Sequence, residues 1–176
     1  SLALPRIPRG SGFTAVAVEG EDCSGRSSDA CKVYVATNGA QPESWLVTPS
    51  LVVPTDPEFH QLADVWTGDV AAGITAVHDD LTTCSAVETG GQNGTGWSTC
   101  RHRFKAFSPD GTRLLATGSA GDGMGDSELA VLDSRTGKVE EDLRTADGAV
   151  ITQMGWEDGS HVLATVYEQG RWAVLR

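Results

Sequence analysis

Three carboxylates in a glycine-rich stretch are the side chains best suited to bind a metal ion. Asp122, Asp126 and Glu128 lie among glycines between residues 121 and 128. Carboxylate oxygens are the ligands that Ca²⁺ prefers, and glycines would allow a short loop to wrap around an ion. The twelve-residue pattern of an EF-hand is absent. The stretch therefore predicts either a weak cation site or an acidic loop that needs no cofactor.

Nucleophilic and zinc chemistry find little support in the residue spacing. The nearest approach to the nucleophile elbow G-x-S-x-G is at Ser119, where the first glycine falls at the wrong position. The motif H-E-x-x-H is absent, and the histidines are scattered along the chain at His60, His78, His102 and His161. The sequence therefore predicts no catalytic residue.

The four cysteines favour disulfides. Cys84 and Cys100 are symmetric about Gln92 in a glycine-rich turn region, so they can face each other across a hairpin. Cys23 and Cys31 flank a polar loop, and no pair has the C-x-x-C spacing of redox or zinc sites. We predict the bridges Cys23–Cys31 and Cys84–Cys100, with four free thiols in a cytosolic protein as the alternative. Because disulfides persist in oxidising compartments, the bridges predict an extracytoplasmic protein.

The charge balance limits the kinds of partner. The chain has 24 acidic and 13 basic residues, a formal net charge of −11 and a pI of about 4.6. This composition argues against nucleic acid and anionic lipid surfaces, which require basic patches. No run of about 18 apolar residues predicts a membrane span. The chain begins at Ser1 without a signal peptide, which predicts a processed product or a piece of something longer.

Internal repeats organise the chain into short strands joined by turns. Residues 103–144 form a complete unit of four strands, in which two apolar middle strands are followed by a charged outer strand. Its Asp110-Gly111 turn recurs at Asp158-Gly159, and Leu115-Ala116-Thr117 recurs at the same offset from residue 163. Turn dipeptides recur throughout, and no sustained helical period is visible, so the class is all-β.

The repeats predict a β-propeller segment of about four four-stranded antiparallel blades. The expected blades are residues 1–50, 57–100, 103–145 and 149–176, with the last incomplete, as one part of a larger, seven-bladed ring. In the first blade we expect strands at 2–4, 13–18, 32–37 and 43–47, with 48–58 as a connector. We expect the tryptophans to pack between blades, or to form an aromatic ligand-binding face, at Trp45, Trp66, Trp97, Trp156 and Trp172.

Two segments resemble the TolB-type and WD-repeat-like β-propellers of bacteria. The first is FSPDGTRLLA at residues 107–116, and the second is VLDSRTGK at residues 131–138. The second segment is similar to a D-x-x-T-G-K turn seen in actinobacterial secreted and membrane-anchored propellers. The resemblance covers residues 57–176, and it implies a binding scaffold that sometimes hosts an enzyme.

We therefore expect a non-catalytic binding scaffold. The alternatives are a hydrolase or lyase with a site in the propeller's central channel, and a structural segment of a receptor or sensor ectodomain. The binding face would be the long connections at residues 19–30, 48–58, 78–83 and 119–127, where loops on a rigid scaffold carry binding residues. We expect a basic or Ca²⁺-bridged protein or peptide partner at Asp79, Asp80, Asp122 and Asp126. The sheet faces at the ends of the segment would pack against further blades or cause self-association.

Overall fold

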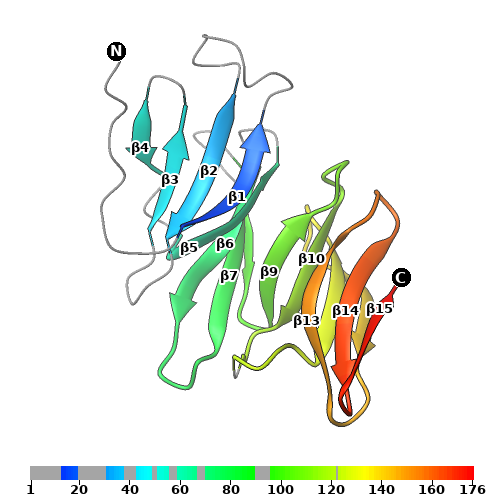
Figure 1. Ribbon diagram of the computed structural model, residues 1–176. Helices are drawn as coiled ribbons and strands as arrows, with labels where there is room; N and C mark the ends of the chain where they lie inside the picture. The colour runs from blue at the N-terminus through cyan, green and yellow to red at the C-terminus, as the bar shows by residue number, and fades with distance from the viewer. Residues whose placement is uncertain are drawn as a thin grey trace.

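The chain folds into four antiparallel β-sheets that follow one another in sequence order (Figure 1). The computed structural model describes residues 13–19, 31–37, 43–48, 51–55, 59–66, 70–89, 96–121 and 123–176, and this part of the chain contains no helix. Each sheet is a meander in which neighbouring strands in the sequence pair with each other. All-β meanders of this kind, stacked face on face, make this chain a β-propeller segment.

The strands have the following bounds. The first sheet contains β1 (Phe13–Glu19), β2 (Lys32–Thr37), β3 (Ser44–Val47) and β4 (Val52–Pro54). The second contains β5 (Gln61–Trp66), β6 (Val70–Val77), β7 (Thr83–Thr89) and β8 (Trp97–Thr99). The third contains β9 (His102–Phe107), β10 (Arg113–Gly118), β11 (Glu128–Asp133) and β12 (Val139–Arg144). The fourth contains β13 (Ala149–Trp156), β14 (Val162–Glu168) and β15 (Arg171–Leu175).

The third sheet shows how strand periodicity builds the core. Successive side chains of a strand point to opposite faces. Leu114 and Ala116 of β10 therefore pack toward the second sheet, whereas Leu115 packs toward the fourth. Leu114 and Leu115 are both fully buried. Apolar residues at nearly every position of the middle strands thus follow from a sheet that is covered on both faces.

The first strand of each sheet lies at a common inner edge. β5 contacts β1 on one side and β9 on the other, and β9 also contacts β13. The outer strands β12 and β15 are exposed along their whole length. In Figure 1 the turns β9–β10 and β13–β14 lie at the top, whereas the connections β6–β7, β10–β11 and β14–β15 lie at the bottom. We call these two ends the short-turn end and the long-loop end.

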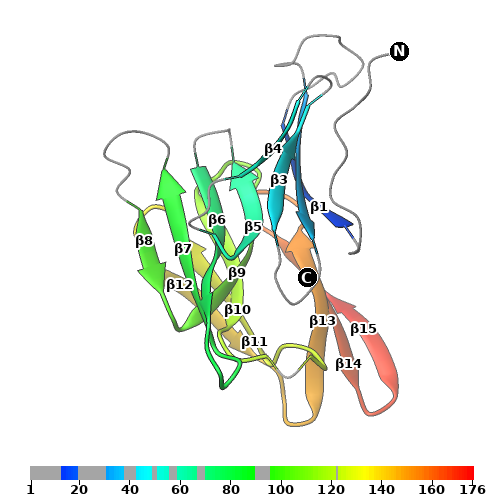
Figure 2. The same cartoon turned by 90° about the vertical axis from the view of Figure 1, so that its left-hand side faces the viewer.

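The first sheet differs from the predicted first blade. Val52–Pro54 pairs with β3 as a fourth strand, so residues 48–58 are not a plain connector and the sheet extends beyond residue 50. Among the described residues, the strand at Phe13–Glu19 is consequently the first of its sheet, not the second (Figure 1 and Figure 2). The predicted strand at residues 2–4 lies outside the described residues. The repeat pattern is most diverged in this part of the sequence. It therefore predicts each of these strands one place later in the sheet than the structure shows.

This order of strands bears on one of the expected binding loops. β1 ends and β2 begins at the short-turn end, at the top of Figure 1, whereas the β6–β7 and β10–β11 connections lie at the other end. Residues 20–30, between β1 and β2, lie outside the described residues, so the expected binding role of residues 19–30 stays a prediction.

Candidate functional site

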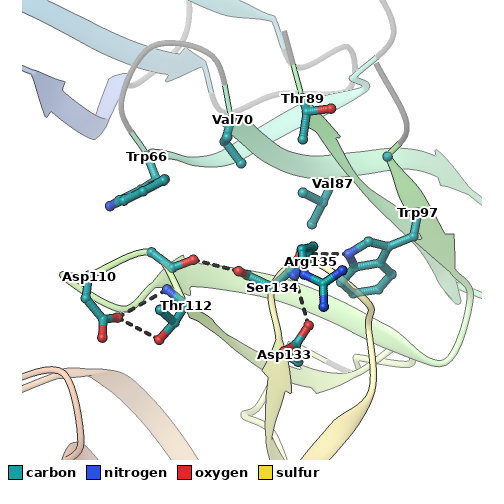
Figure 3. Close-up of a pocket in the computed structure, with 12 residues that line it drawn as sticks. Trp66, Val70, Val87, Thr89, Trp97, Asp110, Thr112, Asp133, Ser134 and Arg135 are labelled. Carbon is teal, nitrogen blue, oxygen red and sulfur yellow. Dashed lines mark hydrogen bonds between the residues drawn. The ribbon is translucent and has the colours of Figure 1, made fainter. Parts of the chain in front are cut away.

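A pocket opens between the second and third sheets at their short-turn end (Figure 3). Its volume is about 450 Å³, which is within the range typical of small-ligand sites. The pocket is lined by residues from the ends of strands and from two tight turns: Trp66, Val70, Val87, Thr89, Gly96, Trp97, Asp110, Gly111, Thr112, Asp133, Ser134 and Arg135. We refer to it as the inter-sheet pocket.

Two tryptophans stand on opposite sides of the inter-sheet pocket (Figure 3). Trp66 ends β5, and its indole packs on the backbone of Gly111, where an added Cβ would overlap the ring. Gly137 plays the same part for Trp97, because an added Cβ would lie 2.6 Å from the indole. Both glycines have φ near +70°, a conformation that other residues rarely adopt. The two turns therefore place glycine backbone, without a side chain, against each indole ring.

Trp97 is fixed by two further contacts. Its indole N–H donates a hydrogen bond of 2.7 Å to the Ser134 carbonyl oxygen in the third sheet. Its ring meets Phe104 of β9 in an edge-to-face arrangement, with centroids 5.0 Å apart. The Ser134 hydroxyl in turn donates to the Gly111 carbonyl oxygen at 2.6 Å. One wall of the pocket is thus rigid before any ligand arrives.

Two aspartates at the rim remain charged. Asp110 Oδ1 accepts hydrogen bonds from the Ser108 hydroxyl and from Thr112, and these bonds lower the pKa of Asp110. Asp133 Oδ1 accepts from the hydroxyl and backbone N–H of Thr136, which lowers the pKa of Asp133. Each carboxylate belongs to a turn and still has a second oxygen. Two carboxylates beside two indoles can accommodate a cationic group through charge and cation–π attraction.

A separate ion cluster involves two of the residues expected to bind a metal. Asp126 Oδ1 lies 2.7 Å from Arg103 Nη2, and Asp126 Oδ2 lies 3.3 Å from Lys105 Nζ. Glu128 lies 3.1 Å from Arg144 Nη2 and 3.6 Å from His102 Nδ1. Both described carboxylates therefore already have cationic partners.

The third expected ligand, Asp122, lies outside the described residues. The cation site at Asp122, Asp126 and Glu128 consequently stays a prediction. Its two described members would have to exchange an ion pair for the metal.

The expected acidic face is only partly assembled from the described residues. The connections β6–β7 and β10–β11 do meet, through a bridge between Thr82 and Ala120. Asp79 and Asp80 are exposed on the first of them, and Asp80 accepts hydrogen bonds from Thr82 that lower its pKa. The side chain of Asp126 is only 11% exposed, so it does not present its charge as Asp79 and Asp80 do.

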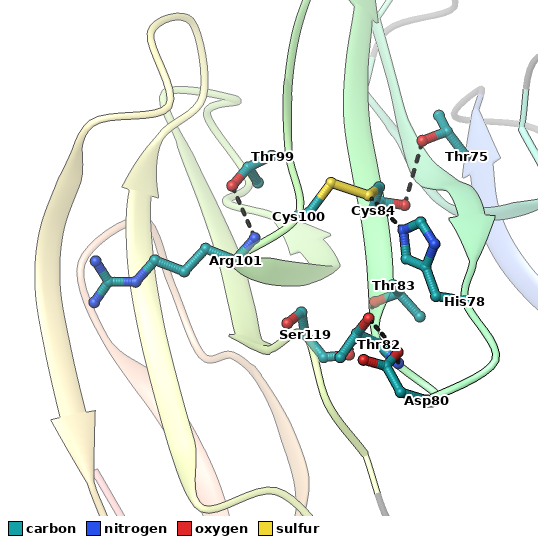
Figure 4. Close-up of a disulfide and its surroundings, with 10 residues drawn as sticks. All are labelled: Thr75, His78, Asp80, Thr82, Thr83, Cys84, Thr99, Cys100, Arg101 and Ser119. Carbon is teal, nitrogen blue, oxygen red and sulfur yellow. Dashed lines mark hydrogen bonds between the residues drawn. A yellow bond between two sulfur atoms is a disulfide. The ribbon is translucent and has the colours of Figure 1, made fainter.

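The Cys84–Cys100 bridge is confirmed (Figure 4). It joins the start of β7 to the end of the β8 hairpin, across 16 positions of sequence. Cys31 is also disulfide-bonded, and its predicted partner Cys23 lies outside the described residues. His78 Nε2 lies 3.2 Å from Cys84 Sγ, but a bonded sulfur is no thiolate ligand, so this group does not make a metal site.

One described turn brings together the residue types of a serine hydrolase. His161 Nδ1 lies 3.1 Å from the Ser160 hydroxyl and 2.9 Å from Asp158 Oδ2. A catalytic triad uses both imidazole nitrogens, one for the nucleophile and one for the carboxylate. Here one nitrogen faces both groups, on an exposed turn. This geometry gives the hydrolase alternative no support at this turn.

Sequence reasoning missed both the inter-sheet pocket and the Arg103–Lys105–Asp126 cluster. The signal for the pocket was present, since Trp66 ends a strand and Trp97 begins one, each beside a turn. No local signal shows that Gly111, 45 positions after Trp66, and Gly137, 40 positions after Trp97, would lie against these rings. The cluster depends on Asp126 of the β10–β11 connection lying against β9, which the sequence does not reveal.

Comparisons with known proteins give a limited result. No protein-family model and no curated protein matches the chain. Among solved structures, the chain is similar to the β-propeller domain of the Trilobed protease from Pyrococcus furiosus, which is described as having an open velcro topology. The identity is 9% and the TM-score 0.42, over 83% of this chain and 53% of that one. The chain therefore spans about half the length of that structure.

A likeness this distant does not assign the fold, which follows from the four meandering sheets. In the part of the chain that the structure describes, no helix is long and apolar enough to cross a membrane.

Proposed function

We propose that this chain is a non-catalytic binding scaffold that receives a basic side chain of a protein or peptide partner in the inter-sheet pocket. The observation that carries the proposal is the pairing of two fixed indoles with two charged carboxylates around one cavity. A lysine or arginine side chain has an apolar stem for the indoles and a cationic head for the carboxylates. Its single charged tip could reach Asp110 or Asp133 without deep burial.

The overall charge supports the same class of partner. A net charge of −11 attracts basic partners at long range and accelerates their association at low salt. Arg135 at the rim is the one positive side chain among the residues lining the pocket, which leaves the rim acidic on balance. We expect Arg135 to select against a second cationic group close to the first.

A basic partner at the long-loop end, on Asp79 and Asp80, is the competing proposal. These two carboxylates are exposed and adjacent, but they do not line the inter-sheet pocket with its two indoles. The short-turn end offers both a cavity and aromatic surface. It is therefore the stronger candidate, and one experiment can compare the two ends.

A peptide selection tests the proposal. A phage-displayed library of random heptapeptides is selected on the wild-type chain, and the enriched peptides are then measured by fluorescence polarisation. We expect enrichment of lysine and arginine, and at least tenfold weaker binding to the double variant Asp110→Asn/Asp133→Asn. Asparagine Oδ1 can still accept the turn hydrogen bonds, so this variant removes charge and keeps the fold.

Matched controls make the result specific. Asp158→Asn changes an aspartate at the equivalent turn of the fourth sheet, which does not line the pocket, and should bind like wild type. Asp79→Asn/Asp80→Asn tests the long-loop end. The proposal fails if basic residues are not enriched, or if binding survives in the first double variant and is lost in the second.

We further propose an extracytoplasmic location and a kinship with bacterial TolB-type propellers. The Cys84–Cys100 bridge supports the location, because such bonds persist in oxidising compartments. The turn motifs at residues 107–116 and 131–138 support the kinship. A segment of a receptor or sensor ectodomain is compatible with the same binding role, and non-reducing peptide mapping of the protein isolated from its native compartment tests the location.

A further inference from the structure

A second cavity lies at the inner edge of the sheets, where β1, β5 and β9 run beside one another. Its volume is about 490 Å³, and it shares no lining residue with the inter-sheet pocket. Its wall is mixed: seven of the ten described lining residues are apolar, but polar atoms form slightly more of the surface than apolar atoms. Gln61, Arg103 and Lys105 are the polar residues among them, and the two charged ones are both positive.

The two cations share one face of β9. Arg103 and Lys105 lie two positions apart, so strand alternation places both side chains on the same side. Phe104 and Ala106 pair with successive residues of β10, so the strand bulges at Lys105, which has no partner in the ladder. Arg103 and Lys105 contact the same carboxylate, that of Asp126, at 2.7 and 3.3 Å.

The carboxylate that they share is held firmly in place. The backbone N–H of Asp126 donates to the Ile151 carbonyl oxygen at 2.8 Å, and the Ile151 N–H donates back at 2.7 Å. This pair of bonds clips the β10–β11 connection onto β13 of the fourth sheet. The carboxylate between the two cations is thus held in place by backbone hydrogen bonds and does not lie on a free loop.

The cluster carries a surplus positive charge. Two cations face one carboxylate, and in the described part of the chain Asp126 is the acidic residue in contact with them. Their side chains are only 26% and 31% exposed. Burial, together with the neighbouring Arg103, lowers the pKa of Lys105, in line with two cations that share one carboxylate. A second anion at this position would give the surplus charge a partner.

We propose that this cavity binds a small amphiphilic carboxylate. Its carboxylate would lie against Arg103 and Lys105, and its apolar part would lie along Leu62, Ala63 and Ile74. A single negative charge matches the single surplus positive charge, and the apolar side chains on part of the wall can receive the apolar part of an organic acid. The site is distinct from the inter-sheet pocket, so the proposal is independent of the function proposed above.

Octanoate and its neutral analogue 1-octanol are the probes for isothermal titration calorimetry. We expect octanoate to bind the full chain and octanol to bind at least tenfold more weakly. Lys105→Met keeps the length of the side chain and leaves Arg103 paired with Asp126, and it should weaken octanoate binding at least tenfold. Lys138→Met, on an exposed turn of the third sheet, is the matched control and should bind like wild type.

A second variant decides the matter if Lys105→Met does not fold. Ala15 lines the cavity and is exposed, so Ala15→Phe should fill the opening without disturbing the core. It should abolish octanoate binding and leave the thermal midpoint unchanged. The proposal is overturned if wild type does not bind octanoate, if octanol binds equally well, or if a folded Lys105→Met or Ala15→Phe protein binds as wild type does.

Discussion

The Asp64 carboxylate of β5 accepts a hydrogen bond of 2.8 Å from the backbone N–H of Phe107 in β9. Its other oxygen accepts from the Val65 N–H, also at 2.8 Å. One side chain therefore ties the inner strand of the second sheet to that of the third. Burial raises the pKa of Asp64 despite these bonds.

Two substitutions at Asp64 separate the hydrogen bond from the charge. Asp64→Ala leaves the Phe107 N–H without an acceptor, which should cost about 1–3 kcal/mol of unfolding free energy in urea at pH 7. Asp64→Asn keeps an acceptor and removes the buried charge, so its stability should equal or exceed that of wild type. Because the pKa of Asp64 is raised in the folded state, protonation of Asp64 stabilises the folded chain, and wild type loses this stability as pH rises through the folded pKa. Asp64→Asn has no titrating group at this position, so it should not show this loss. An unstable Asp64→Asn protein beside a stable Asp64→Ala protein would contradict this account.

The walls of the inter-sheet pocket can be tested through one glycine. In Gly137→Ala the new methyl meets the Trp97 indole and the positive φ is also strained. Gly148 has a similar φ of +82° and open space around it, so Gly148→Ala isolates the backbone strain. We expect about 1–2 kcal/mol of destabilisation for Gly148→Ala and about 1–3 kcal/mol more for Gly137→Ala. A shifted tryptophan fluorescence maximum should accompany only the Gly137 variant, and equal losses at both positions would show that Trp97 does not pack there.

Stability should depend on pH through His102. This side chain is 3% exposed, and burial is the main cause of its lowered pKa, opposed by nearby Glu128. Below pH 6.5, the ordinary value, the unfolded chain binds the proton more readily than the folded chain. Stability should therefore fall as pH decreases from 6.5 toward the folded pKa, by up to about 1.4 kcal/mol per pH unit. The slope should flatten in His102→Asn, and an unchanged slope would assign it to other groups.

The Cys84–Cys100 bridge should stabilise the second sheet. Closing a loop across 16 positions should contribute about 3 kcal/mol in the chain-entropy account. We expect the double variant Cys84→Ser/Cys100→Ser to lose about that amount in urea unfolding. The Cys31 bond remains in this variant and serves as the internal reference. A double variant as stable as wild type would show that the bridge does not stabilise the folded chain.

The outer face of the fourth sheet should cause the chain to self-associate. Tyr167 and Trp172 pair across β14 and β15 with ring centroids 4.8 Å apart, and Trp172 and Val174 are 65% and 69% exposed. The corresponding face of the third sheet is covered by the fourth. Sedimentation velocity should show concentration-dependent association that Trp172→Ser/Val174→Ser abolishes. Leu143→Ser, at an exposed position of β12, should change nothing, and a wild-type chain that stays monomeric at high concentration would refute the idea.

The sequence alone determined the class of fold and most of its strands. Asp-Gly turns and apolar middle strands depend on local chemistry, since a tight turn needs specific residues and a sheet covered on both faces needs apolar side chains throughout. The Cys84–Cys100 pairing was equally readable, because hairpin symmetry places the two residues opposite each other. In the first sheet, where the repeat diverged, the repeat pattern predicted each strand one place later in the sheet than the structure shows.

Only the tertiary structure decided where ligands could bind. The inter-sheet pocket needs Trp66 and Gly111 in contact, and no spacing within either segment implies that contact. Asp126 looked like an exposed metal ligand or docking residue, but the fold places it against Arg103 and Lys105. Side-chain partners on different strands depend on how the sheets stack and on where the β10–β11 connection lies, which are properties of the whole arrangement and not of any local sequence.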